Sequence, residues 1–566
     1  MINALNSVAQ VMAQTLKAYD TKHFFLLTGG DQDLWIALRD ADIEMVLARS
    51  ERAAAYMADA YARLTYKPAF TYGQFGPGAA VLVGGIVDPY WAGAPVVVIT
   101  SSSNTMTRYK SEYQEIDQKP LFQPITKMNV ELPRADRAAE ILRSAIRAAV
   151  TGNPGPVHID VPMDMFGADA GGPPIYAEPG FSQYPATRPL PNRDDIEKAC
   201  KLLVEANKPV MVAGTGVVAS QAWDELTKLS ESLNLPVATT MGGKGSIAET
   251  HSNSVGVVGR YSRKSANEIV SEADVVFAVG CTLGALATDT FQIPSRDARI
   301  IHVDIDPTVL GTAYQEEVSI EADAKAALTA MLEYLDSEGE RRPSGDNGWL
   351  EHVSSKTAAW REAYAEAATK SQSGAIAPHA VFRSLQEVLQ PQDVMVADTG
   401  YMGAWAGALY EVKAPGSYFI RTGGSLGWAF PAALGAQVAR PQSRVVAIIG
   451  DGGVGYHIGD METARRLNLP VIVLILNNRS LAFEYHIQKY LFDTEVSVVN
   501  DFYDTNYADV ARAFGWYGKR IEEATEITRA LSEALDSGEP AVVEVMIDKE
   551  ATAPVTYYES VVERVV

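Results

Sequence analysis

With 566 residues, the chain is too long for a single hydrophobic core, so roughly three domains of ordinary size are expected. Hydrophobic residues make up 47% and charged residues 21%, which is typical of a globular protein and excludes a largely disordered one. The formal net charge of −22 disfavours nucleic-acid binding, because that function usually needs a basic surface. The two cysteines, Cys200 and Cys281, are too few for a disulfide framework, and no Cys/His cluster has metal-ligand spacing.

The first block, residues 1–166, alternates short apolar runs with helical patterns. Residues 23–27 and 95–100 predict strands, and residues 51–63 predict a helix. Residues 1–20 predict an amphipathic helix rather than a signal peptide, because polar residues interrupt the apolar ones. No apolar run approaches the length of about 20 residues that spans a bilayer. We therefore expect a cytoplasmic protein without membrane or nucleic-acid partners.

The rest of the chain predicts two more blocks of the same kind. Strands that alternate with helices form mainly parallel sheets, with ligand sites at the carboxyl ends of the strands. We therefore expect an α/β protein of three domains, each a mainly parallel sheet flanked by helices. The predicted boundaries are 1–166 for the first domain, 167–192 for a linker rich in Pro and Gly, 193–335 for the central domain, 336–374 for a polar linker, 375–550 for the third domain and 551–566 for a tail. Further predicted strands are 209–213, 275–279, 299–303, 394–397, 444–449 and 471–476.

The most specific pattern lies in residues 444–480, which read RVVAIIGDGGVGYHIGDMETARRLNLPVIVLILNNRS. One apolar strand ends at Asp451, between glycines, and the next ends at Asn477-Asn478. Neighbouring parallel strands would bring a carboxylate and an amide to one sheet edge, and these are the oxygen ligands that Mg²⁺ prefers. The glycines let backbone N–H groups approach a diphosphate. Alone, a GDG could cap a helix and an NN could form a turn, but the combination is far more specific.

This segment resembles the GDG…NN motif of the thiamine-diphosphate-dependent enzymes. The resemblance implies that Asp451, Asn478 and the main-chain carbonyl of Ser480 hold Mg²⁺, which joins the protein to the diphosphate. It extends over essentially the whole chain and is strongest to the branch of acetolactate synthase, benzaldehyde lyase and 2-hydroxyacyl-CoA lyase. In that family the first domain binds the pyrimidine ring of the cofactor and the third binds its diphosphate.

A second motif surrounds Glu51, where the sequence reads VLARSERAAAYMADAYARLTYKPAFTYGQFGPGAA. An apolar strand ends at a glutamate that opens an Ala-rich helix, and a second strand leads to a Gly-Pro-Gly turn. This region resembles the "RHE…GYAR…SGPG" region of the same families, which implies that Glu51 is the carboxylate beside N1′ of the aminopyrimidine. A glutamate at a helix start is also favoured by the helix dipole alone.

Other site residues follow from shorter resemblances. The stretch EYQEIDQKPLFQPITK resembles "FQE…P.TK" and places Gln114 at a substrate-facing glutamine, with a solvated loop residue as the alternative. The stretch TGGSLGWAFPA resembles "GGLGTMGFGLPA" and places Leu426 under the cofactor, with an ordinary core leucine as the alternative. The full set of expected cofactor-binding residues is Gly29, Gly30, Pro77, Tyr401, Met402, Leu426, Gly450, Gly452, Gly453 and Leu481. The expected substrate-facing residues are Phe75, Phe483, Glu484 and His486.

The central block contains GTGVVA at residues 214–219, which matches the dinucleotide fingerprint G-x-G-x-x-A. A lone match is weak, and no ribose-binding acid follows at the usual distance. The block instead resembles the central domain of acetolactate synthases, which holds FAD in some relatives, ADP or coenzyme A in others and nothing in many. Leu286 replaces the second Arg of the "GARFDDR" pattern of the biosynthetic enzymes. Whether FAD or ADP binds here is therefore left open.

The resemblance implies an acetolactate-synthase-type carboligase, which decarboxylates a 2-oxo acid and adds the enamine to an acceptor carbonyl, in a homodimer or dimer of dimers (a homotetramer). The alternative is a carbon–carbon lyase acting on a 2-hydroxy ketone, a 2-hydroxyacyl-CoA or oxalyl-CoA. The active-site histidine of benzaldehyde lyase is replaced near Gly29-Gly30. Intact Glu51, Asp451 and Asn478 argue against an inactive homologue, and only the GTGVVA match supports a nicotinamide oxidoreductase.

Overall fold

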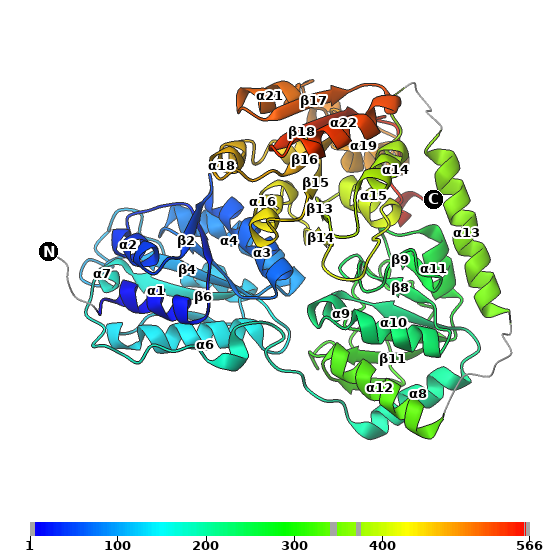
Figure 1. Cartoon of the computed structure of the whole chain (residues 1–566), viewed down its shortest axis with the longest axis horizontal. Helices are drawn as coiled ribbons and strands as arrows, with labels where there is room; N and C mark the ends of the chain where they lie inside the picture. Colours follow the sequence, from blue (N-terminus) through cyan, green and yellow to red (C-terminus); the bar gives the residue numbers. More distant parts are fainter. Residues whose placement is uncertain (1–5, 340–347, 370–374, 560, 562–566) are drawn as a thin grey trace. The chain divides into compact units, whose positions relative to one another are not determined.

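The computed structural model describes residues 6–339, 348–369, 375–559 and 561. These residues form three parallel six-stranded sheets with flanking helices, one sheet in each predicted block (Figure 1). The predicted three-domain α/β fold is therefore confirmed. Within the described part of the chain, no helix combines the length and the apolar character needed to cross a membrane.

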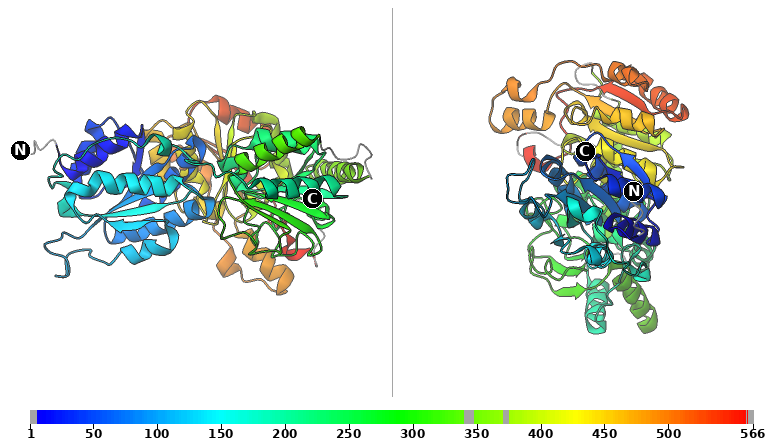
Figure 2. Two further views of the ribbon diagram at one scale, coloured as in Figure 1. Left: turned by 90° about the horizontal axis from the view of Figure 1, so that it is seen from below. Right: turned by 90° about the vertical axis from the view of Figure 1, so that its left-hand side faces the viewer.

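The first sheet has the strand order β2-β1-β3-β4-β6-β5. Successive side chains of a strand face opposite sides, so Leu26, Tyr72 and Ile99 share a core with helices α1, α2 and α6. Helices α3 and α4 pack together against β3, while α6 lies along β4 and β6 (Figure 2). The strands are β1 (His23–Leu26), β2 (Glu44–Leu47), β3 (Ala69–Gly73), β4 (Val96–Ser102), β5 (Asn129–Glu131) and β6 (Val157–Pro162). The helices are α1 (Val8–Ala18), α2 (Gln32–Asp40), α3 (Glu51–Thr65), α4 (Pro77–Ala92), α5 (Lys119–Phe122), α6 (Ala138–Val150) and α7 (Met163–Phe166).

The second sheet has the order β12-β11-β10-β7-β8-β9, because the chain adds β8 and β9 on one side of β7 and then β10, β11 and β12 on the other. The order of the strands therefore reverses between β7 and β10, which are themselves parallel. The glycines of the GTGVVA motif lie at this reversal, where Gly216 N donates to Gly280 O at 2.8 Å. A Cβ atom added to Gly214 would lie 2.1 Å from that of Cys281. The close approach of these two segments therefore explains why the first residue of the motif is a glycine. The strands are β7 (Pro209–Ala213), β8 (Val237–Thr239), β9 (Ser254–Val257), β10 (Val275–Val279), β11 (Arg299–Asp304) and β12 (Val318–Glu321). The helices are α8 (Arg193–Glu205), α9 (Thr215–Ala219), α10 (Trp223–Ser232), α11 (Lys264–Ser271) and α12 (Ala324–Glu338).

The third sheet has the order β14-β13-β15-β16-β18-β17, which is the order of the first sheet repeated with new strands. The two outer blocks thus share a topology that the central block lacks. The strands are β13 (Val394–Ala397), β14 (Phe419–Arg421), β15 (Val445–Gly450), β16 (Ile472–Asn477), β17 (Tyr517–Ile521) and β18 (Ala541–Met546). The helices are α14 (Pro378–Val388), α15 (Tyr401–Leu409), α16 (Ala429–Ala439), α17 (Asp451–Val454), α18 (Asp460–Arg466), α19 (Ala482–Leu491), α20 (Ser497–Asn500), α21 (Tyr507–Ala513) and α22 (Ile527–Asp536).

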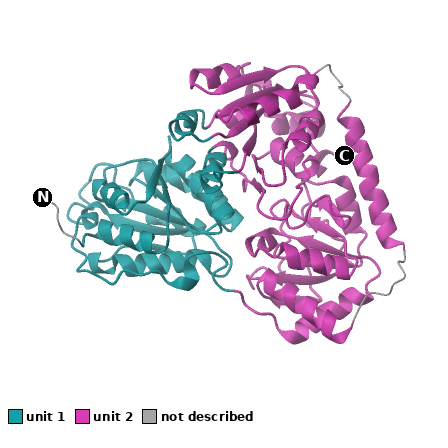
Figure 3. Ribbon diagram, in the orientation of Figure 1, with its two compact units in different colours: residues 1–187, 431–442, 457–469 teal, residues 188–430, 443–456, 470–566 magenta. Residues whose placement is uncertain are grey.

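Helices α16 and α18 pack with the first block although they belong to the third block in sequence. A Cβ atom added to Gly435 in α16 would lie 2.1 Å from the carbonyl oxygen of Met57, so the two backbones are in direct contact. Near α18, the backbone N–H of Arg49 donates to the carboxylate of Asp460 at 2.9 Å. By such contacts the chain forms two compact units, of residues 1–187, 431–442 and 457–469 and of residues 188–430, 443–456 and 470–566 (Figure 3).

The eight predicted strands match observed strands to within two residues at each end. The segment expected to be the second linker carries a long helix, α13 (Trp349–Ala367), with Trp349 and Trp360 buried. Residues 340–347 and 370–374 of that segment lie outside the described residues, as do 1–5, 560 and 562–566.

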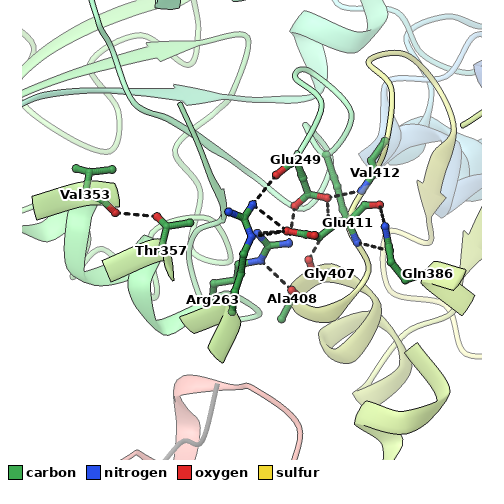
Figure 4. Close-up of polar contacts among 11 residues, drawn as sticks. Glu249, Arg263, Val353, Thr357, Gln386, Gly407, Ala408, Glu411 and Val412 are labelled. Carbon is green, nitrogen blue, oxygen red and sulfur yellow. Dashed lines mark hydrogen bonds and ion pairs between the residues drawn. The ribbon is translucent and has the colours of Figure 1, made fainter. Parts of the chain in front are cut away.

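A buried ion network joins the central block to helix α15 (Figure 4). The side chains of Lys244, Glu249 and Arg263 are fully buried, and Glu249 pairs with both cations. Lys244 Nζ and Arg263 Nε also donate to the carbonyls of Gly407 and Ala408, each at 2.9 Å. Burial lowers the pKa of Lys244 to about 8. Because the carbonyls at a helix C-terminus carry partial negative charge, the two cations hold the last turn of α15 in place.

Candidate active site

Glu51 lies at the carboxyl edge of the first sheet, where β2 leads into α3. The Ser50 side chain accepts a hydrogen bond from Ala53 N and so caps the helix that Glu51 opens. The glutamate side chain is half-buried against the first turn of α4, because a Cβ atom added to Gly78 would lie 2.8 Å from Glu51 Oε1. The glycine therefore makes room for the carboxylate.

Several other predicted residues lie beside the same edge. A Cβ atom added to Gly29 would lie 2.8 Å from the side-chain oxygen of Gln74, and Gln74 Nε2 donates to Gln114 Oε1 at 3.4 Å. Phe75 is buried, and Pro77 is the first residue of α4. Gly30 is exposed, with Met163 as its nearest neighbour. The first compact unit thus places Phe75, Pro77 and Gln114 around the turn after β3, whereas Phe483, Glu484 and His486 belong to the other unit.

Asp451 and Asn478 follow the adjacent parallel strands β15 and β16, as the motif predicts. Asp451 is 4% exposed, and its Oδ2 atom has no hydrogen-bond partner among the residues that the structure describes. Burial raises the pKa of this carboxyl group to about 7. The Asn478 Oδ1 atom accepts from Ser480 N at 3.1 Å, which folds the segment after β16 back on itself.

This arrangement fits a magnesium ion. A buried carboxylate oxygen without a partner is costly unless a cation compensates it. Across the described ranges, no group of three or more His, Cys, Asp or Glu side chains is placed to hold a metal. The remaining ligands would therefore be amide, carbonyl and phosphate oxygens, as Mg²⁺ prefers.

The turn that carries Leu426 is held by Asp398, a residue that no sequence motif indicated. The Asp398 carboxylate follows β13 and accepts hydrogen bonds from Gly427 N at 3.0 Å and from Ala429 N at 3.4 Å. A Cβ atom added to Gly453 would lie 2.4 Å from Asp398 Oδ2. Asp398 thus links the half-buried Leu426 turn to the turn of Asp451, and its position directly after a predicted strand is the signal that could have found it.

The glycines after β15 also allow close contacts. A Cβ atom added to Gly452 would lie 2.8 Å from the Leu481 side chain, and one added to Gly450 would lie 3.8 Å from that of Met402. Leu481 and Met402 therefore border the same turn, from the starts of α19 and α15.

The other predicted residues of α15 and α19 divide between interior and surface. The Tyr401 hydroxyl contacts His486 Nδ1 at 2.7 Å and donates to Tyr558 at 3.1 Å. His486 is fully buried, and burial lowers its pKa to about 4. Phe483 packs edge-on against Tyr401, whereas Glu484 is exposed. The structure therefore places Tyr401 and His486 in an aromatic cluster and does not bring Glu484 to it.

Comparison with known proteins finds domains of one enzyme family along the chain. Residues 6–121 match the family "Thiamine pyrophosphate enzyme, N-terminal TPP binding domain", residues 196–331 match its central domain, and residues 398–545 match its C-terminal TPP binding domain. The chain is 34% identical to a probable acetolactate synthase large subunit of Methanococcus aeolicus over 553 residues, which cover 95% of this chain and 92% of the relative. It is 30% identical to the large subunit of acetolactate synthase isozyme 3 of Escherichia coli, over 94% of this chain and 92% of the relative.

Proposed function

Because the chain belongs to the acetolactate synthase branch of the thiamine pyrophosphate enzymes, we propose that it decarboxylates a 2-oxo acid and joins the remaining fragment to an acceptor carbonyl. The observation that carries this proposal is the buried Asp451 carboxylate, which lies beside Asn478 at one sheet edge. Similarity to acetolactate synthase large subunits over nearly the whole chain favours the carboligase over the lyase alternative.

Bound thiamine diphosphate would supply a carbon nucleophile and an acceptor for the electrons released on decarboxylation. Asp451, Asn478 and the carbonyl of Ser480 would hold Mg²⁺, whose remaining positions suit phosphate oxygens. The turn after β15 is rich in glycine, so its backbone can approach the diphosphate closely. Leu426 would support the cofactor from the turn that Asp398 fixes.

Glu51 would hold a proton at N1′ of the aminopyrimidine. Two observations support this role: the side chain is half-buried at a sheet edge, and Gly78 leaves room for its carboxylate. Glu51→Gln keeps the shape of the side chain but cannot move the proton. The variant should bind cofactor while exchange of the cofactor C2 proton for deuterium, followed by NMR, slows greatly. An unchanged exchange rate would remove Glu51 from the mechanism.

Gln114 and Phe75 would face the substrate. Gln114 carries amide donors that suit the oxygens of a 2-oxo acid, and the contact from Gln74 places its amide beside the turn that follows β3. Phe75 adds apolar surface at the same turn. These two residues would orient the substrate next to the cofactor, beside whose aminopyrimidine ring Glu51 would lie.

The site would be completed by a second copy of the chain. Glu51 belongs to one compact unit and Asp451 to the other. We expect each site to take Glu51 from one chain and Asp451 from its partner, in a dimer with closed symmetry or a dimer of such dimers.

The experiment that tests the reaction is a substrate panel. Purified protein with thiamine diphosphate and Mg²⁺ is given pyruvate, benzoin or a 2-hydroxyacyl-CoA, and release of CO₂ and aldehyde is followed. Pyruvate should give CO₂ and a condensed product, with no aldehyde from the other two. Cleavage of benzoin or of the acyl-CoA without turnover of pyruvate would support the lyase instead.

A further inference from the structure

Gln114 has a backbone conformation that its residue type rarely adopts. Its φ angle is +64°, in the left-handed region, which costs a residue other than glycine roughly 1–2 kcal/mol. Such a conformation persists only where the surrounding structure imposes it. The residues that impose this backbone conformation therefore also determine where the Gln114 side chain, which we assign to the substrate, can lie.

The side chain of Gln118, four residues later, makes the contacts that can do this. It is 2% exposed, and its Oε1 atom accepts from Gly76 N at 3.1 Å. Its Nε2 atom donates to Ser101 O at 2.6 Å, to Asp160 Oδ1 at 2.8 Å and to Thr100 Oγ1 at 3.0 Å. These three acceptors lie on the adjacent strands β4 and β6. The side-chain amide of Gln118 thus binds the end of the loop that carries Gln114 both to the sheet and to the turn after β3.

Asp160 makes this anchor stronger than an ordinary amide contact. Its buried Oδ1 atom also accepts from Thr100 Oγ1 at 2.9 Å, so two donors share a single carboxylate. A hydrogen bond to an ionised acceptor is roughly twice as strong as one between neutral groups. Removing Gln118 would also leave part of this acceptor unpaired, which is costly in the interior.

Gly76 connects the anchor to Gln114. A Cβ atom added to Gly76 would lie 2.2 Å from the carbonyl oxygen of Gln114 and 3.1 Å from its Cβ atom, so the two backbones touch. Gly76 has a φ angle of +70°, which glycine accepts readily. The hydrogen bond from Gly76 to Gln118 therefore fixes the surface on which the Gln114 backbone rests.

We infer that Gln118 is a positioning residue, which holds Gln114 over the turn at Gly76 in the conformation that presents its amide to the substrate. The inference rests on the proposed function, because Gln114 is there assigned to the substrate. Gln118 itself is turned into the sheet and touches no reacting group.

The first test is a double-mutant cycle. Gln118→Ala should lower kcat/KM for pyruvate roughly tenfold, since small misplacements of a site residue have effects of this size or larger. Gln114→Ala should lower it as much or more. Because Gln118 acts through Gln114, the double variant should be within about twofold of Gln114→Ala alone. Effects that multiply instead would overturn the inference.

The second test needs no substrate. Lys110 is exposed in the loop that Gln118 anchors, so trypsin cleavage after Lys110, identified by mass spectrometry, reports opening of the loop. Gln118→Ala should raise the cleavage rate roughly tenfold in the full-length protein. The matched control Gln123→Ala changes an exposed glutamine nearby and should leave the rate unchanged. An unchanged rate in Gln118→Ala would contradict the anchor.

These outcomes separate the inference from the proposed function. If Gln114→Ala turns over pyruvate like the wild type, the substrate role of Gln114 is wrong and the inference falls with it. If Gln114→Ala is impaired but Gln118→Ala is not, only the inference fails. Should Gln118→Ala fold poorly, Gln118→Glu replaces it, because a carboxylate set against Asp160 would break the same anchor. A Gln118→Glu protein with wild-type kinetics and cleavage would overturn the inference equally.

Discussion

Gly78→Ala tests how closely the protein controls the Glu51 carboxylate. The added Cβ atom would lie 2.8 Å from Glu51 Oε1, whereas ordinary contact begins at 3.4 Å, so the carboxylate must retreat by about 0.6 Å. The helix itself should tolerate the change, since Gly78 is not among the residues with positive φ and alanine is the better helix former. A displacement of this size at a reacting group is expected to lower kcat roughly ten- to a hundredfold.

The assay for Gly78→Ala combines kcat, exchange of the C2 proton in the bound cofactor and the thermal midpoint. Both rates should fall together while the thermal midpoint and the affinity for cofactor stay near those of the wild type. Gly84→Ala in the same helix is the matched control, because its added Cβ atom would lie 3.5 Å from Arg52 Nε in ordinary contact. If Gly78→Ala keeps both rates within about twofold of Gly84→Ala, the reasoning about Glu51 is refuted.

Four further predictions concern the metal, the shared site, the ion network and the central block. Asp451→Ala, or removal of divalent ions by a chelator, should release thiamine diphosphate without unfolding the chain, and retention at wild-type affinity in equilibrium dialysis would contradict the metal assignment. Co-expression of Glu51→Ala with Asp451→Ala chains should restore roughly a quarter of wild-type activity in a shared site, and none if both residues come from one chain. Glu249→Ala leaves the buried Lys244 without its carboxylate and Arg263 with only the weaker pair to Glu411 at 3.6 Å, so denaturant unfolding should show a loss of about 3–5 kcal/mol in the free energy of unfolding, and a loss below about 1 kcal/mol would contradict that view of the network. Because Leu286 replaces the second Arg of the "GARFDDR" pattern, we predict that the purified protein shows no flavin absorbance and needs no added FAD, and a yellow protein that loses activity on flavin removal would overturn this prediction.

The strands and the metal motif could be predicted because local sequence determines them. Apolar runs between turn residues mark buried parallel strands, and the carboxyl ends of adjacent strands meet at one edge. Asp451 and Asn478 could therefore be paired from their positions in the sequence alone. Helix α13 was missed because its flanking residues have linker composition, whereas its buried Trp349 and Trp360 gain stability only from tertiary contacts.

The roles of residues that act through tertiary contacts could not be predicted from the sequence, although the position of Asp398 directly after a predicted strand marks it as a candidate. Asp398 and Gln118 receive or make their hydrogen bonds with backbone groups far along the chain, and no spacing rule reports such contacts. The packing of α16 against α3 depends on the contact between Gly435 and Met57, which the strand pattern does not show. The place of His486 after the metal motif predicts a residue near the substrate, whereas its stacking against Tyr401 in an aromatic cluster is visible only in the fold.

The most direct test of the central claim is carbon NMR of the product made from pyruvate labelled with ¹³C at C2. Two labelled carbons become bonded when a decarboxylated fragment joins the carbonyl of a second pyruvate, so the product should show one-bond ¹³C–¹³C coupling. The coupled product should require thiamine diphosphate and Mg²⁺ and should disappear in Glu51→Gln. Release of CO₂ with uncoupled acetaldehyde as the only labelled product would contradict the account, because it would show decarboxylation without formation of a carbon–carbon bond.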